Sequence, residues 1–80
     1  RSRMNAVEQI NARWEPDGSI TPLRFTVLGR DYVVESVGRA WRDDDGYHVL
    51  CMAGGNAVYE LVLSLDLTWR GREPAGRKMG

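Results

Sequence analysis

The eighty residues predict an all-β protein of five to six antiparallel strands, arranged as a small SH3-like barrel or half-barrel. Runs of alternating apolar and polar residues recur along the chain, and Gly-rich or Asp-rich turn signals separate them at residues 29–30, 43–46 and 53–56. Several short strands divided by such signals are typical of a small barrel. A lone glycine inside the longest run, Gly38, indicates the bend that a curled sheet needs.

Residues 23–41 predict the central hairpin. If Gly29 and Arg30 form a two-residue loop of type II′, the register of the two strands is fixed. The predicted cross-strand pairs are Leu28 with Asp31, Val27 with Tyr32, and Phe25 with Val34. Because side chains alternate across a strand, one face of the hairpin is apolar and points to the core.

The amino-terminal segment fits two patterns. Val7, Ile10 and Trp14 have the spacing of a helix face, whereas Ile10, Ala12 and Trp14 alternate as in a strand. Alternation favours a strand over residues 8–15, followed by a turn at residues 16–19. Pro22, which has no N–H to donate to a ladder, marks the start of the next strand.

The carboxyl-terminal half predicts strands at residues 47–52, 57–63 and 67–70. The predicted core comprises Phe25, Tyr32, Val34 and Leu61, with Trp14 or Trp69 closing one end. In a sheet that does not close, residues 8–15 and 67–70 are edge strands with few charges or prolines to protect them. Such edges favour a homodimer.

The chain divides into a single β domain at residues 4–72 and a mobile basic tail at residues 73–80. Residues 1–3 precede Met4, the candidate initiator, and are not counted in the fold. The net charge is zero, with +3 over residues 70–80 and −3 over residues 1–69, which argues against a broad nucleic-acid-binding face. No apolar segment resembles a signal peptide or a bilayer span, so the expected location is the cytoplasm.

Catalytic, cofactor-binding and metal-ligating residues are not predicted, and the chain is not expected to be an enzyme. Cys51 and His48 are the only residues of their types, too few for a His/Cys metal cluster or a histidine pair. Cys51 is predicted to be a small buried hydrophobe and His48 a strand residue with its ring at the surface. Asp43, Asp44 and Asp45 read as a solvated turn without the ligand spacing of a calcium loop.

One group of residues has functional potential, a speculative nucleic-acid patch of Arg30, Arg39, Trp41 and Arg42. Arginines beside an aromatic ring bind single-stranded nucleic acid by pairing with phosphates and stacking on a base. The competing interpretation is that Trp41 is half-buried and the arginine stems cover its edges.

Several short motifs carry a resemblance to a known family: residues 14–18 (WEPDG), 22–25 (PLRF), 29–34 (GRDYVV), 41–42 (WR) and 59–61 (YEL). Together they resemble a bacterial family of short β-rich domains of unknown function, over roughly residues 7–70. Some members are attached to polymerase-like proteins of DNA damage tolerance. The resemblance implies a β fold and transfers no functional residue.

The sequence therefore predicts a protein–protein interaction module that is able to self-associate. The alternative is a weak accessory nucleic-acid-binding domain. The two differ in whether single-stranded DNA contacts Trp41.

Overall fold

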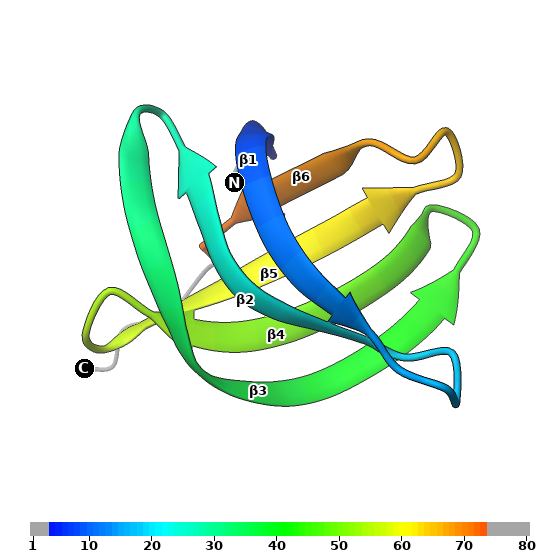
Figure 1. Cartoon of the computed structure of the whole chain (residues 1–80). Helices are drawn as coiled ribbons and strands as arrows, with labels where there is room; N and C mark the ends of the chain where they lie inside the picture. The colour runs from blue at the N-terminus through cyan, green and yellow to red at the C-terminus, as the bar shows by residue number, and fades with distance from the viewer. Residues whose placement is uncertain (1–3, 74–80) are drawn as a thin grey trace.

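The computed structural model describes residues 4–73, and its six strands form one closed antiparallel barrel in the order β1 to β6 (Figure 1). The strands are β1 (Asn5–Trp14), β2 (Ile20–Val27), β3 (Arg30–Asp43), β4 (Gly46–Ala53), β5 (Ala57–Ser64) and β6 (Trp69–Arg72). The predicted all-β barrel is confirmed. Across residues 4–73 there is no helix long and apolar enough to cross a membrane. The predictions for residues 1–3 and 74–80 lie outside the described residues.

The central hairpin forms one residue earlier in the chain than predicted. Its loop is Leu28-Gly29, both with positive φ (53° and 78°), as a type I′ turn requires. Phe25 therefore pairs with Tyr32, and Val27 with Arg30. The predicted register was wrong, because Phe25 pairs with a residue of β3 two positions earlier than predicted. Side chains alternate with a period of two, so the apolar residues keep their predicted face.

A bulge explains the helix-like spacing in β1. The register against β2 shifts between Val7 and Gln9, so Val7 and Ile10, three residues apart, both pack against the core. A bulge inserts one residue and changes the phase of a strand. The helical alternative was wrong, and β1 begins at Asn5, earlier than predicted.

A second bulge places Pro22 inside β2. The partners change from Asn11 with Arg24 to Ala12 with Pro22, which leaves Leu23 as the additional residue. Pro22 is fully buried, whereas the prediction placed it at the start of the strand. β2 starts two residues earlier, at Ile20, and because of the bulge Pro22 and Phe25 are both buried, while Leu23 and Arg24 between them are exposed.

β3 bends where predicted. Its register against β4 shifts between Val37 and Ala40, around Gly38, and a further irregularity lies between Val34 and Ser36. These irregularities let one long strand belong to both halves of the barrel: its first part pairs with β2 and its later part with β4.

The last strand, β6, lies between β5 and β1 and closes the barrel. It covers residues 69–72, two residues later than predicted, because the β5–β6 turn occupies residues 65–68. Asn5 pairs with Gly71 and Ala6 with Arg70. The predicted open edge at residues 67–70 was therefore wrong, and with it one of the two reasons for expecting a dimer.

The core lies inside the barrel and is formed mainly by β2, β4 and β5. Phe25 and Leu61 are fully buried as predicted, and Tyr32 and Val34 are partly buried against the core. Trp69 also packs against the core. Trp14 is 63% exposed and therefore does not close an end of the core.

The barrel has two different ends because the connections of an antiparallel meander alternate between them (Figure 1). At the closed end, with the β2–β3 and β4–β5 turns, the rings of Phe25, Tyr32 and Tyr59 have centroids 4.9–5.5 Å apart. Burial and a hydrogen bond with Tyr32 raise the pKa of Tyr59. At the open end, with the other three connections, large apolar side chains remain exposed.

Candidate functional site

Four charged side chains form a network on the outer face of the sheet, next to the open end. His48 of β4 lies between two carboxylates, with Nδ1 2.8 Å from Glu60 Oε2 and Nε2 2.8 Å from Asp43 Oδ1. Arg72 of β6 donates to the other oxygen of Glu60 from Nε and Nη2, at 3.2 and 3.1 Å. We call Asp43, His48, Glu60 and Arg72 the charged network.

The centre of the network is shielded from water, whereas the Asp43 and Arg72 side chains at its two ends are 44% and 37% exposed. His48 and Glu60 are each 7% exposed, although both lie on the outside of the barrel. The Trp41 ring stacks on His48, with centroids 4.9 Å apart and planes 8° apart. The prediction that the His48 ring lies at the surface was wrong, because the neighbouring side chains on the outer face cover it.

The arrangement favours the protonated form of His48. Ionised carboxylates only accept hydrogen bonds, so a ring between two of them donates from both nitrogens. Burial lowers the pKa of His48, but the hydrogen bonds to Glu60 and Asp43 raise it by more, and the result lies above 6.5. The same hydrogen bond from His48 lowers the pKa of the Asp43 carboxyl below 3.8. With His48 protonated, the network contains two positive and two negative groups.

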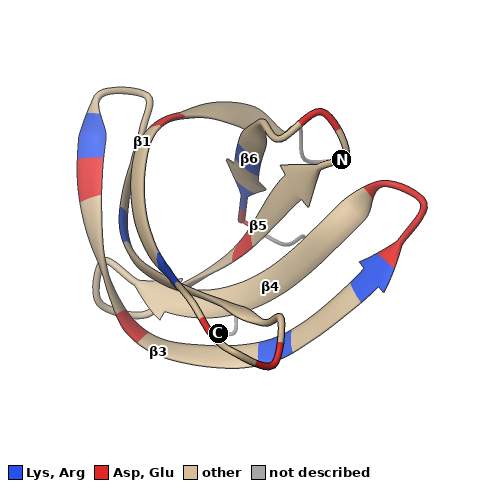
Figure 2. Ribbon diagram, turned by 45° about the vertical axis from the view of Figure 1, so that its right-hand side comes forward, with Lys and Arg blue, Asp and Glu red and all other residues tan. Residues whose placement is uncertain are grey.

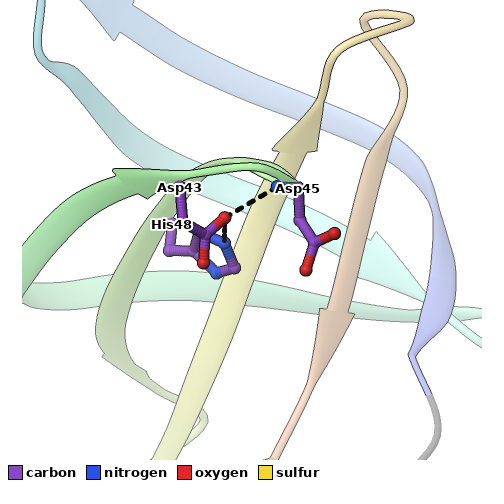
Figure 3. Close-up of side chains that lie close together, drawn as sticks. All are labelled: Asp43, Asp45 and His48. Atoms are coloured by element: carbon purple, nitrogen blue, oxygen red, sulfur yellow. Dashed lines mark hydrogen bonds and ion pairs between the residues drawn. The ribbon is translucent and has the colours of Figure 1, made fainter.

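The β3–β4 turn adds a further acidic group to the network. Asp45 donates its backbone N–H to Asp43 Oδ1 at 2.8 Å. One ligand atom each from Asp43, Asp45 and His48 lies within 4.8 Å of the others (Figure 3). Gly46 follows at φ 135°, where a side chain would collide with the backbone of Leu63, so the turn fits tightly against β5. The turn that the sequence predicts to be solvated is thus ordered by hydrogen bonds and joined to the charged network through Asp43.

The structure does not gather the four residues of the predicted nucleic-acid patch. Arg30 lies beside the β2–β3 turn at the closed end, and the basic segments of β3 are spread along its length (Figure 2). Arg39 lies over the Trp41 ring at 5.1 Å. Arg42 lies over Tyr47 at 4.9 Å and donates to the Gly18 carbonyl oxygen at 2.9 Å.

Cys51 is 2% exposed and packs in the core. Burial raises the pKa of its thiol to about 11. Because the thiolate is the reactive form, this cysteine acts as a small apolar side chain at neutral pH, as predicted.

Three of the exposed large apolar residues lie together at the open end of the barrel. Trp14, Leu65 and Leu67 are 63%, 78% and 74% exposed and line one hollow of about 300 Å³, whose wall includes the buried Ile20, Tyr47 and Leu63. We call Trp14, Leu65 and Leu67 the apolar rim.

The turn that carries both leucines of the rim is well ordered by hydrogen bonds. Ser64 and Leu67 donate backbone N–H groups to Thr68 and Ser64 carbonyls, each at 2.8 Å. Asp66 accepts from both the N–H and the hydroxyl of Thr68, and these bonds lower the pKa of its carboxyl. Leu67 has φ 71°, a conformation that costs a residue with a Cβ about 1–2 kcal/mol.

Comparison with known proteins finds one partial similarity. The chain is similar to VirB9. Protein virB9 of Rhizobium radiobacter and protein virB9 of Agrobacterium tumefaciens (strain 15955) are each 43% identical to it over 47 residues. The matched stretch is 59% of this chain and 15% of each VirB9, so the chain spans only a small part of these relatives. No family model matches. No solved structure matches.

This similarity corrects the predicted location. The similarity to VirB9 points away from the cytoplasm. The prediction failed because it relied on a missing signal peptide in this stretch of sequence, whereas the matched part of VirB9 is itself a small fraction of a longer protein. The resemblance to β-rich domains of DNA damage tolerance stays a prediction.

Sequence reasoning treated His48, Glu60 and the three aspartates as separate features. One signal could have joined them. The Gly-rich turn at residues 54–56 gives a register in which His48 pairs with Val62 and Leu50 with Glu60. His48 and Glu60 are then diagonal neighbours on one face, within reach of long side chains.

Proposed function

We propose that this barrel is a protein-interaction module and that the apolar rim is its docking surface. The partner is a protein that inserts an apolar segment into the hollow between Trp14, Leu65 and Leu67. The observation that carries the proposal is the gathering of three large, mostly exposed apolar side chains around one hollow.

The exposure of the rim argues for contact with another protein. Single exposed apolar residues are ordinary on a protein surface, but a contiguous group that surrounds a hollow is characteristic of interaction sites. Aromatic and leucine side chains in such a hollow lose water on binding, which contributes about 25 cal/mol for each Å² of apolar area buried.

The conformation of the rim supports the same conclusion. Leu67 is held with positive φ although its side chain is 74% exposed and stabilises little in the isolated chain. Glycine or asparagine at this position removes the backbone strain at no cost in packing. A strained residue held in place by its surroundings is a pointer to function.

The similarity to VirB9 supports a role in an assembly. The 43% identity to VirB9 over 47 residues is consistent with a protein partner for this module. We propose further that the module belongs to a bacterial envelope assembly. The alternative of nucleic-acid binding draws less support, because Arg30 lies apart and Trp41 already stacks on His48.

Photo-crosslinking in the native cell tests the proposal. A photoreactive phenylalanine analogue replaces Leu65 or Leu67 in turn, and Leu28 serves as the control, because it is 73% exposed in a turn at the closed end. The proposal predicts discrete adducts from positions 65 and 67 and none from 28. No adduct at either rim position, or equal adducts at all three, would overturn it. An adduct of twice the chain mass identifies a second copy instead of a different partner.

A further inference from the structure

We propose that Asp43, Asp45 and His48 form a binding site for a divalent transition-metal ion of the zinc class. Glu60 is not a ligand in this site but holds the His48 ring through a hydrogen bond to Nδ1. The three proposed ligands come from the end of β3, the β3–β4 turn and β4 (Figure 3). This inference does not rest on the proposed docking role of the apolar rim, although Asp43 also lines the hollow there.

The three side chains offer the right donor atoms at nearly the right separation. Two carboxylate oxygens and one imidazole nitrogen lie within 4.8 Å of one another. Zinc binds such oxygens and nitrogens at about 2.0–2.2 Å, and sites with three protein ligands leave one position for water or a substrate. Calcium and magnesium prefer six or more oxygen ligands, so the imidazole favours zinc.

The second argument is the hydrogen bond between His48 and Glu60, which is not one of the three proposed ligands. Glu60, on β5, accepts from His48 Nδ1 at 2.8 Å, which fixes the ring so that Nε2 points toward Asp43. Metal-binding histidines almost always donate their other ring N–H to a carboxylate or carbonyl in this way. Arg72 binds the remaining oxygen of Glu60, so the supporting carboxylate is already neutralised.

The charges of the turn favour a cation at this point. Asp43, Asp44 and Asp45 are consecutive, and the Asp45 carboxylate has no hydrogen-bond or ion-pair partner among residues 4–73. A metal ion replaces the proton on His48 Nε2 and accepts lone pairs from the ring and from both carboxylates. Nδ1 keeps its proton and its bond to Glu60.

The turn itself supplies a matched control. Asp44 carries the same charge as Asp45 and is also exposed, but it is not part of the converging group. Replacing either residue with asparagine removes one unit of charge from the same turn. Only Asp45→Asn removes a proposed ligand, so the two variants separate coordination from general attraction of cations.

Titration calorimetry with zinc chloride, at neutral pH in a non-chelating buffer, tests the site. The unchanged protein is expected to bind one Zn²⁺ per chain and to prefer it to Mg²⁺. Asp45→Asn should weaken binding at least tenfold, Glu60→Gln by roughly 10–100-fold as for other outer-shell partners, and Asp44→Asn by less than twofold. No zinc binding by the unchanged protein, or equal weakening by Asp44→Asn and Asp45→Asn, would overturn the proposal.

A spectroscopic measurement on the unchanged protein tests the site without any substitution that lowers stability. His48 is the only histidine in the chain, so its ring signals in a nuclear magnetic resonance spectrum need no assignment. Zinc should shift the Nε2 signal strongly and leave Nδ1 protonated. Ring signals that do not move at saturating zinc would also overturn the proposal.

Discussion

The two ends of the barrel use similar side chains for different purposes. At the closed end, Phe25, Tyr32 and Tyr59 stack on one another, so each ring finds its partners inside the chain. At the open end, Trp14 and Leu67 are exposed around a hollow and find no such cover. The first arrangement stabilises the fold, and the second is available for contact with another molecule.

The difference follows from topology as much as from composition. The open end holds three of the five connections, including the longest, and the closed end holds two tight turns. Connecting loops often carry binding residues, because the scaffold holds the loops in place without depending on their side chains. The charged network reaches the open end through Asp43, which also lines the hollow of the apolar rim.

The largest expected effect is at the closed end. Phe25 is 1% exposed and contacts both tyrosine rings, so Phe25→Ala should cost about 3–5 kcal/mol, a large part of the total stability of a domain. Urea unfolding of Trp14→Ala, at the open end, should differ from the unchanged protein by less than about 1 kcal/mol. Equal losses from the two substitutions would show that the ends do not differ.

The charged network should contribute less than the aromatic cluster. Glu60→Gln keeps the shape of the side chain but leaves His48 and Arg72 without their shared carboxylate, at a cost of about 1–3 kcal/mol. Asp44→Asn, in the exposed turn, should change the free energy of unfolding by less than about 0.5 kcal/mol. If the two variants unfold at the same urea concentration, the network is not coupled to folding.

Stability should also depend on pH through His48. Its folded pKa is raised above 6.5, so its contribution is complete below pH 6.5 and is lost as the pH rises through the folded value. The pKa of Asp43 is lowered, so its contribution is present above pH 3.8 and is lost as the pH falls through the folded value. Thermal unfolding with a chelator present should therefore show greatest stability at mildly acidic pH. A stability that rises steadily from pH 6 to 9 would contradict the charged state of His48.

The smallest expected effect is a gain at the closed end. Leu28 is 73% exposed with φ 53°, in a type I′ turn that favours Asn-Gly. Leu28→Asn should stabilise the protein by about 0.5–1 kcal/mol, since asparagine tolerates this conformation better than leucine. Leu28→Val is the comparison, because a β-branched residue fits positive φ poorly and should destabilise the turn.

Alternation and turn chemistry were sufficient to predict the fold class, the face of the central hairpin and the burial of Phe25, Cys51 and Leu61. They failed where a bulge changes the phase of a strand. Val7 and Ile10 have a helical spacing in the sequence because one residue between them bulges out of the ladder. Pro22 lies inside β2 for the same reason, and no local pattern distinguishes that position from a strand start.

The candidate sites were harder to predict because they join distant residues. The charged network joins β3, β4, β5 and β6, and its members are brought together only by the registers of three ladders. The apolar rim combines Trp14 with two leucines from the β5–β6 turn, far along the chain. Trp14 was expected in the core because an aromatic residue in an alternating run is usually buried, and the strand ends before its ring is covered.

The most direct test of the difference between the ends is one variant measured in two ways. Trp14→Ser, Leu65→Ser and Leu67→Ser are combined in one chain, and a photoreactive analogue at Thr68, in the same turn, reports contact in the cell. The account predicts a free energy of unfolding within about 1 kcal/mol of the unchanged protein, together with loss of the adducts that the analogue gives on the unchanged rim. A loss of stability as large as that of Phe25→Ala, or adducts that persist, would contradict it.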